Sequence, residues 1–185
     1  GWHSTGLYAA PGEHLTVTLP TAAADQGLLV RIGCHKDSLW HLDTWKRCPE
    51  ITRTFALRET STLVANAFGG PVYVEVPARC PLGPVTVTIQ GAVEAPHFVL
   101  GQTDPVQWRT LRMAPAPWAE LESAKVILSV PSKTVRTLDN PVALMEFWTH
   151  VADSCQELLG RPLARQRPER YVADVQISAG YMHSG

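Results

Sequence analysis

Few residues of this sequence have a type and spacing that could do chemistry. Cys34 and His35 are adjacent, and a thiol beside an imidazole is the pairing of a nucleophile with its base. Consecutive strand residues point to opposite faces, so we expect Cys34 to be a buried thiol rather than half of a reactive pair. Glu146 and His150 lie one helical turn apart, as two ligands of one metal would, but we identify no third ligand beside them. A solvated helix face explains these two residues better.

A loop cluster is the stronger candidate for a binding surface. Histidine, aspartate and tryptophan side chains follow an apolar, strand-like run over residues 28–35. Loops carry function more often than cores do, so these residue types predict a binding loop. The alternative is a surface loop pinned by its tryptophans. The candidate residues are His35, Asp37, Trp40, His41 and Trp45.

The common catalytic motifs are absent from the 185 residues. There is no Gly-rich phosphate loop, no Gly-x-Ser-x-Gly elbow and no His-Glu-x-x-His. We therefore predict no catalytic residue and no metal ligand within this chain.

Charge and hydropathy exclude two classes of partner. Lys and Arg number 16 against 17 Asp and Glu, and no window is densely basic, which argues against nucleic acid and anionic membranes as partners. The apolar runs are far shorter than the roughly 20 residues of a membrane span. Protein and small-molecule partners remain open. The sequence starts with neither Met nor a signal-peptide pattern, so localisation cannot be read from it.

The four cysteines have wide, irregular spacing and no Cys-x-x-Cys pair. We expect buried thiols at Cys34, Cys48, Cys80 and Cys155. Two disulfides remain the alternative for a secreted protein, by any of three connectivities.

Period-two alternation dominates the first hundred residues and predicts half-buried antiparallel strands at 15–19, 72–76 and 85–89. The run over 28–35 is more continuously apolar, as in a central strand. Gly69 and Gly70 lie between two strand-like runs, which predicts a tight hairpin. The expected fold is α+β, mainly β: an antiparallel, sandwich-like sheet portion over residues 1–100, followed by one long helix and a final strand.

We expect residues 101–185 to form a mixed α/β portion. Asp104 and Pro105 predict a capped short helix through residue 112, and a proline-rich connector over 114–118 precedes a strand at 125–131. The long helix is expected over 141–159, with Asp139 or Asn140 as its cap and an apolar stripe on one face. The final strand is expected over 171–177. An exposed apolar patch is predicted near the long helix or this strand, where a missing part of the domain would pack.

Seven segments, in order, resemble the upstream half of the peptidase domain of the enhancin-like zinc metallopeptidases. The same segments are similar to the TRP-channel-associated factors, which carry an enhancin-like domain whose zinc motif can be degraded. These segments are Trp2–Tyr8, Ile32–His35, Phe68–Gly70, Gly91–Pro96, Ala116–Leu121, Leu128–Ser132 and Ala173–Gly185.

The resemblance implies a β-rich upstream portion followed by a largely helical, zinc-binding portion. Two histidines and a glutamate beyond Gly185 would bind zinc in the parent protein, and a glutamate beside the first histidine would be the general base. The implied substrates are glycoproteins, including mucins, cleaved in their polypeptide. The missing downstream helical half is then an expected partner of this chain.

The end of the chain is the candidate point of contact with substrate. Metallopeptidases commonly hold an extended substrate against an edge strand, so the final strand and its turn are the expected cleft wall. The candidate substrate-binding residues are Ser178, Gly180, Tyr181 and His183. The alternative is a turn packed on the core by Tyr181 and Met182.

Three functions follow from these observations. The first is the substrate-side portion of a zinc glycoprotein peptidase, inactive alone and secreted or at the cell surface. The second is a noncatalytic protein-interaction module, as in the channel-associated factors, cytoplasmic or membrane-associated. The third is a carbohydrate-binding β-sandwich with Trp40, Trp45 or Trp118 as stacking platforms.

Overall fold

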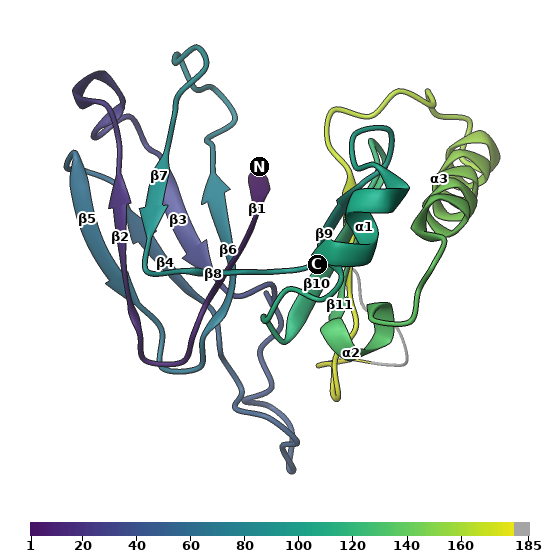
Figure 1. The fold of residues 1–185 in the computed structure, drawn as a ribbon, viewed down its shortest axis with the longest axis horizontal. Helices are drawn as coiled ribbons and strands as arrows, with labels where there is room; N and C mark the ends of the chain where they lie inside the picture. The colour runs from purple at the N-terminus through teal and green to yellow at the C-terminus, as the bar shows by residue number, and fades with distance from the viewer. Residues whose placement is uncertain (180–185) are drawn as a thin grey trace. The chain divides into compact units, whose positions relative to one another are not determined.

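The computed structural model describes residues 1–179, and the chain divides into two compact units, Gly1–Glu94 and Ala95–Gly185 (Figure 1). Each unit has its own hydrophobic core. No helix among the described residues combines the length and apolar character that crossing a bilayer requires.

Unit 1 contains two antiparallel sheets. The larger has the strand order β4-β3-β6-β1-β8 and the smaller the order β5-β2-β7. The bounds of the larger sheet's strands, in chain order, are β1 Trp2–Ala9, β3 Leu29–Ile32, β4 Arg53–Ala56, β6 Gly70–Glu75 and β8 Val93–Glu94. Those of the smaller sheet are β2 His14–Thr18, β5 Ser61–Ala65 and β7 Thr88–Gln90, and a short 3₁₀ helix, η1, covers Thr21–Ala23.

The alternation of the strands builds the core of unit 1. Leu15 and Val17 of β2 are fully buried, as are Val30 and Ile32 of β3, and all four belong to one cluster. The antiparallel pairing predicted for this region is confirmed, and β2 buries alternate residues as expected. Two predicted strands differ: Tyr73 of β6 is fully buried together with Val72, and the strand expected at 85–89 covers only Thr88–Gln90 as β7. The run expected as a central strand forms β3, which lies between β4 and β6 but ends at Ile32, because the chain turns at Gly33.

The hairpin predicted at Gly69 and Gly70 is wrong. The strands on either side, β5 and β6, belong to different sheets, so the chain crosses from one sheet to the other here. Gly70 is required for a different reason: a Cβ on it would lie 2.7 Å from the backbone of Gly33. The two glycines mark a close backbone approach rather than a two-residue turn.

Unit 2 is a four-stranded sheet of order β12-β11-β10-β9 with three helices. The central pair, β10 and β11, is antiparallel, and each outer strand runs parallel to its neighbour. Helices α2 and α3 contact β10 and β11, and α1 contacts β9. The strand bounds are β9 His97–Val99, β10 Trp118–Glu122, β11 Val126–Pro131 and β12 Glu169–Val172, and the helices are α1 Pro105–Leu111, α2 Ser132–Val135 and α3 Pro141–Leu158.

Both longer helices begin where their caps predict. The Asp104 carboxylate accepts from the N–H of Val106 at 2.6 Å and completes a capping box at the start of α1. At the start of α3, the Asn140 side chain accepts from the N–H of Ala143 at 3.1 Å, so Asn140, rather than Asp139, caps this helix. These two helix predictions are confirmed.

Two boundaries in unit 2 differ from the prediction. The proline-rich connector ends one residue early, because Trp118 already begins β10, which the sequence pattern did not reveal. The final strand covers Glu169–Val172 and so begins earlier and ends earlier than the expected 171–177. Strand β12 stops where its pairing with β11 stops.

The prediction of four buried thiols is wrong for most of them. Cys34 is buried, Cys80 is half-buried, and Cys48 and Cys155 are exposed; none of the four forms a disulfide. Cys155 is exposed because the buried stripe of α3 ends at Ala152.

Large apolar side chains are exposed where a patch was predicted, along α3 and beyond it: Phe147, Leu158, Leu159, Leu163, Tyr171 and Val175.

Candidate substrate-binding edge and aromatic loop

Strand β12 is the outermost strand of its sheet, and it pairs only with β11 among the described residues. The N–H of Glu169 donates to the carbonyl of Lys125 at 2.9 Å, and that of Ala173 to the carbonyl of Ser129 at 3.0 Å. Alternate residues of a strand present their backbone groups to opposite sides. Val172 therefore points its N–H and C=O away from β11, in the direction from which another strand would pair.

One face of β12 is held by a buried ionic network. The Arg170 guanidinium pairs with the Glu120 carboxylate of β10, and each side chain is only 8% exposed. Ser129 of β11, between them in the sheet, donates its hydroxyl to Glu120 at 2.6 Å and accepts from Arg170 at 3.1 Å. A buried charge left without its partner is costly, so this network fixes the position of β12 across three strands.

The opposite face of β12 is held by aromatic contact with α3. Tyr171 lies opposite Leu128 of β11 in the register, and Leu128 belongs to the core of unit 2. The Tyr171 ring contacts that of Trp148, with centroids 5.6 Å apart. Because both faces of the strand are anchored, its outward backbone groups are positioned before any ligand arrives.

The candidate residues at the chain end follow this strand. Ser178 is half-buried, six residues after the end of β12. Gly180, Tyr181 and His183 lie outside the described residues. The role assigned to these four residues stays a prediction.

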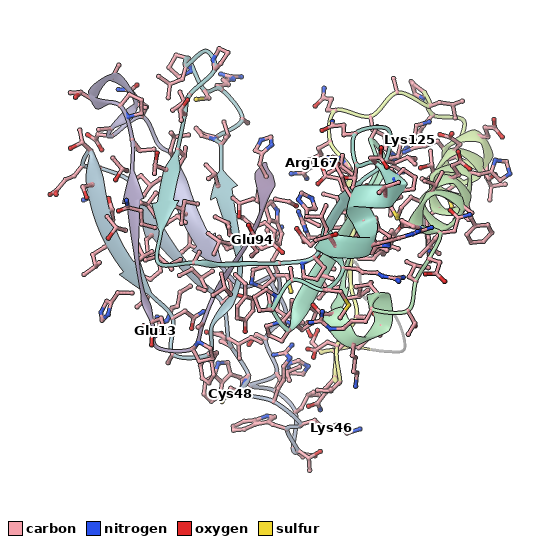
Figure 2. The ribbon with its side chains drawn as sticks, in the orientation of Figure 1. Glu13, Lys46, Cys48, Glu94, Lys125 and Arg167 are labelled. Atoms are coloured by element: carbon pink, nitrogen blue, oxygen red, sulfur yellow. The ribbon has the colours of Figure 1, made fainter. Side chains whose placement is uncertain are left out.

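The loop between β3 and β4 is the second candidate. It is the long blue segment that extends below the five-stranded sheet in Figure 1, and Figure 2 labels Lys46 and Cys48 on it. Trp40 and Trp45 are 62% and 51% exposed, and their rings meet edge to face with centroids 5.3 Å apart. His41 beside them is also exposed.

The remaining candidates of this loop are less accessible. His35 is buried and Asp37 is half-buried, where it pairs with Arg47 at 3.4 Å. Both line a cavity of about 250 Å³ whose walls also include Lys36 and Glu50. The structure therefore divides the predicted cluster into an exposed aromatic pair and a recessed polar cavity.

The described residues do not fit a zinc site. Among them, no three His, Cys, Asp or Glu side chains gather closely enough to hold a metal ion. Glu146 and His150 are both exposed on α3, and Cys34 and His35 are both buried at the end of β3.

Burial, and secondarily the neighbouring Cys34 thiolate, raises the pKa of the Tyr8 phenol above its ordinary value near 10.0.

Glu120, Ser129 and Arg170 were not found from the sequence. A signal for Glu120 existed, because Ala119 and Leu121 alternate with it as buried residues do in a strand. Because the segment just before it is rich in proline, we predicted a connector there rather than a strand. Arg170 lies 50 residues away, and no sequence pattern connects it to Glu120.

Comparison with protein families defines the class. Residues 1–90 match the N-terminal domain of M60-like peptidases, and residues 91–185 match peptidase M60, enhancin and enhancin-like. The chain belongs to the enhancin and enhancin-like M60 peptidase family. The resemblance found in the sequence is confirmed.

Similar curated proteins are TRPM8 channel-associated factors. The chain is 44% identical over its whole length to TRPM8 channel-associated factor 2 of Bos taurus, and 40% identical to factor 1 of Homo sapiens. In each case it spans 20% of the relative's length.

Solved structures of M60 domains share the fold. The M60 catalytic domain of Clostridium perfringens ZmpC, determined in complex with the sialyl T antigen, superposes with a TM-score of 0.69 at 15% identity, over 92% of this chain and 39% of that one. The ZmpB metallopeptidase of the same organism gives 0.68 at 16% identity, with the same coverage.

Proposed function

We propose that this chain is the N-terminal domain and the substrate-side sheet of an M60 metallopeptidase that cleaves the polypeptide of glycoproteins such as mucins. Membership of the family supports the reaction class. The complex of ZmpC with the sialyl T antigen supports a glycoprotein substrate. Zinc, in this proposal, is bound by residues beyond Gly185, since the described residues offer no ligand set.

The single observation that carries the proposal is the geometry of β12. Its outward backbone groups at Val172 match what an extended polypeptide needs for strand addition. The ionic network on one face and the Tyr171–Trp148 contact on the other hold the strand in place. The peptide would pair with β12 through main-chain hydrogen bonds, which are independent of the substrate's sequence.

A proline substitution tests this role. In the full-length protein, Val172→Pro removes the outward N–H but leaves the ladder to β11 intact, because the N–H groups that donate to β11 belong to Glu169, Tyr171 and Ala173. One lost hydrogen bond is worth about 0.5–1.5 kcal/mol, so kcat/KM for mucin cleavage should fall by roughly 2- to 13-fold. Val172→Thr keeps the N–H and should cleave like the parent. Equal rates for both variants would exclude strand addition at this residue.

A second function is favoured by the relatives. Identities of 40–44% over the whole chain are to channel-associated factors, so the same surface would serve a noncatalytic interaction module that binds a protein partner. Zinc content decides between the two. A chain extended past Gly185 that takes up one zinc per molecule and cleaves mucin supports the peptidase. The same chain without zinc and without cleavage supports the module.

A further inference from the structure

The Trp40–Trp45 pair has no part in the proposed function. Trp side chains are large and mostly apolar, and exposing two of them side by side on a loop forgoes the stabilisation that burying them would give. Both are more than half exposed, and they are in contact with one another. Paired exposed aromatics of this kind are typical of ligand-binding surfaces.

The loop holds the pair in place without a ligand. The Trp45 indole N–H donates to the carbonyl of Leu39 at 2.9 Å, and Leu39 is fully buried. The Leu39 N–H donates in turn to the carbonyl of Pro49 at 3.3 Å. Arg47 adds bonds to the carbonyls of Cys48 and Pro49 at 3.0 and 3.2 Å. A ligand would therefore lose little free energy to ordering the loop.

The geometry of the two rings suits one saturated six-membered ring. Their planes lie at 86°, so one ring offers a flat floor and the other a wall. The C–H groups on one face of a pyranose carry slight positive charge and stack on the negative face of an indole. The hydroxyls at the rim of the sugar need both donors and acceptors, and the same loop carries His41, Asp43 and Lys46 as exposed polar residues.

The charge of the loop argues against other occupants. Its cationic and anionic side chains balance, so nothing favours a nucleic acid or an anionic membrane. A proline-rich peptide needs an aromatic-lined groove with successive pockets, and this pair forms a single corner. The charged residues are Lys36, Lys46 and Arg47 against Asp37, Asp43 and Glu50.

We propose that Trp40 and Trp45 form a glycan-binding site that stacks one neutral pyranose ring. The class of sugar with the best apolar face is galactose, whose axial 4-hydroxyl leaves three C–H groups together on one side. A single stacked ring binds weakly, with a Kd on the order of 1 mM. The site lies in unit 1 and needs neither β12 nor zinc.

Saturation-transfer NMR on the full-length protein tests the site. The probe is methyl β-galactopyranoside, and the expected result is strongest transfer to the three C–H groups of its apolar face. Trp40→Ala should weaken binding by roughly 10-fold, whereas Trp40→Phe, which keeps a ring, should retain part of it. Leu63→Ala is the matched control, since Leu63 is 65% exposed and lies on β5 of the smaller sheet in unit 1, outside this loop. A thermal melt checks that each variant is folded.

Each other outcome contradicts the site. The first is no saturation transfer to the galactoside, and the second is equal transfer in the parent and in Trp40→Ala. The third is binding that depends on Trp40 but is to a polyproline peptide or to phosphatidylserine vesicles, with no binding of the glycoside. The readout is separable from the proposed function, because Val172→Pro should bind the galactoside normally. Loss of cleavage alone therefore leaves this inference standing.

Discussion

Replacing Arg170 by methionine tests whether the buried ionic network positions β12. The change removes the Arg170 cation from the Glu120 carboxylate, which is only 8% exposed, while the Ser129 hydroxyl still donates to it. Breaking one partner of a buried pair costs about 3–5 kcal/mol, a large part of the roughly 5–15 kcal/mol that stabilises a typical domain. Arg170→Met should therefore lower the free energy of unfolding of unit 2 by about 3–5 kcal/mol.

The measurement is urea unfolding of residues 1–185, with hydrogen exchange to locate the change. Exchange at the β11 and β12 amides should accelerate, whereas the strands of unit 1 should keep their protection. The double variant Glu120→Leu with Arg170→Met removes both charges and should recover to within about 1–2 kcal/mol of the parent.

Arg165→Met is the matched control. Arg165 pairs with Glu169 at 2.7 Å; the Arg165 side chain is 13% exposed, but Glu169 is 49% exposed, so the loss should stay below about 1 kcal/mol. A loss of stability in Arg170→Met no larger than in this control would show that the ionic network does not hold β12. A double variant as unstable as the single one would show the same.

Three further perturbations follow from local geometry. Gly33→Ala places a Cβ 2.5 Å from the Thr52 hydroxyl at a φ of +115°, so it should cost about 2 kcal/mol or more in urea unfolding, and a loss under about 0.5 kcal/mol would contradict the close approach. Asp104→Ala removes the cap on the Val106 N–H and should cost about 1 kcal/mol, while Asp104→Asn, which still caps, should cost little. Burial raises the pKa of Tyr8, so its contribution to stability is complete below its ordinary pKa near 10.0 and is lost as pH rises through the higher folded value. Tyr8→Phe should flatten that loss in unfolding curves between pH 9 and 11, and an unchanged slope would be evidence against the burial effect.

Local signals in the sequence were sufficient for much of the fold. Alternating residues located β2 and β6, and the Asp104 cap located the start of α1, because these signals depend only on neighbours in the chain. The hairpin at Gly69 and Gly70 failed since the same two glycines also suit a crossing between sheets. Which strands pair is a long-range property that the alternation does not encode.

The candidate site was only partly accessible to sequence reasoning. Trp40 and Trp45 were predicted to lie in a binding loop, but their exposure and their edge-to-face contact required the structure. The parallel pairing of β12 with β11, and the buried pair of Glu120 and Arg170, join residues far apart in the chain. No periodicity within either segment indicates such a partner.

We propose that β12 receives the substrate polypeptide of an M60 metallopeptidase. The most direct measurement is the rate of zinc-dependent mucin cleavage by the chain extended past Gly185, compared between Val172→Pro and Val172→Thr. We predict cleavage by the parent and by Val172→Thr, and roughly 2- to 13-fold slower cleavage by Val172→Pro at unchanged zinc content. Cleavage at the same rate by both variants, or none by the zinc-loaded parent, would contradict it.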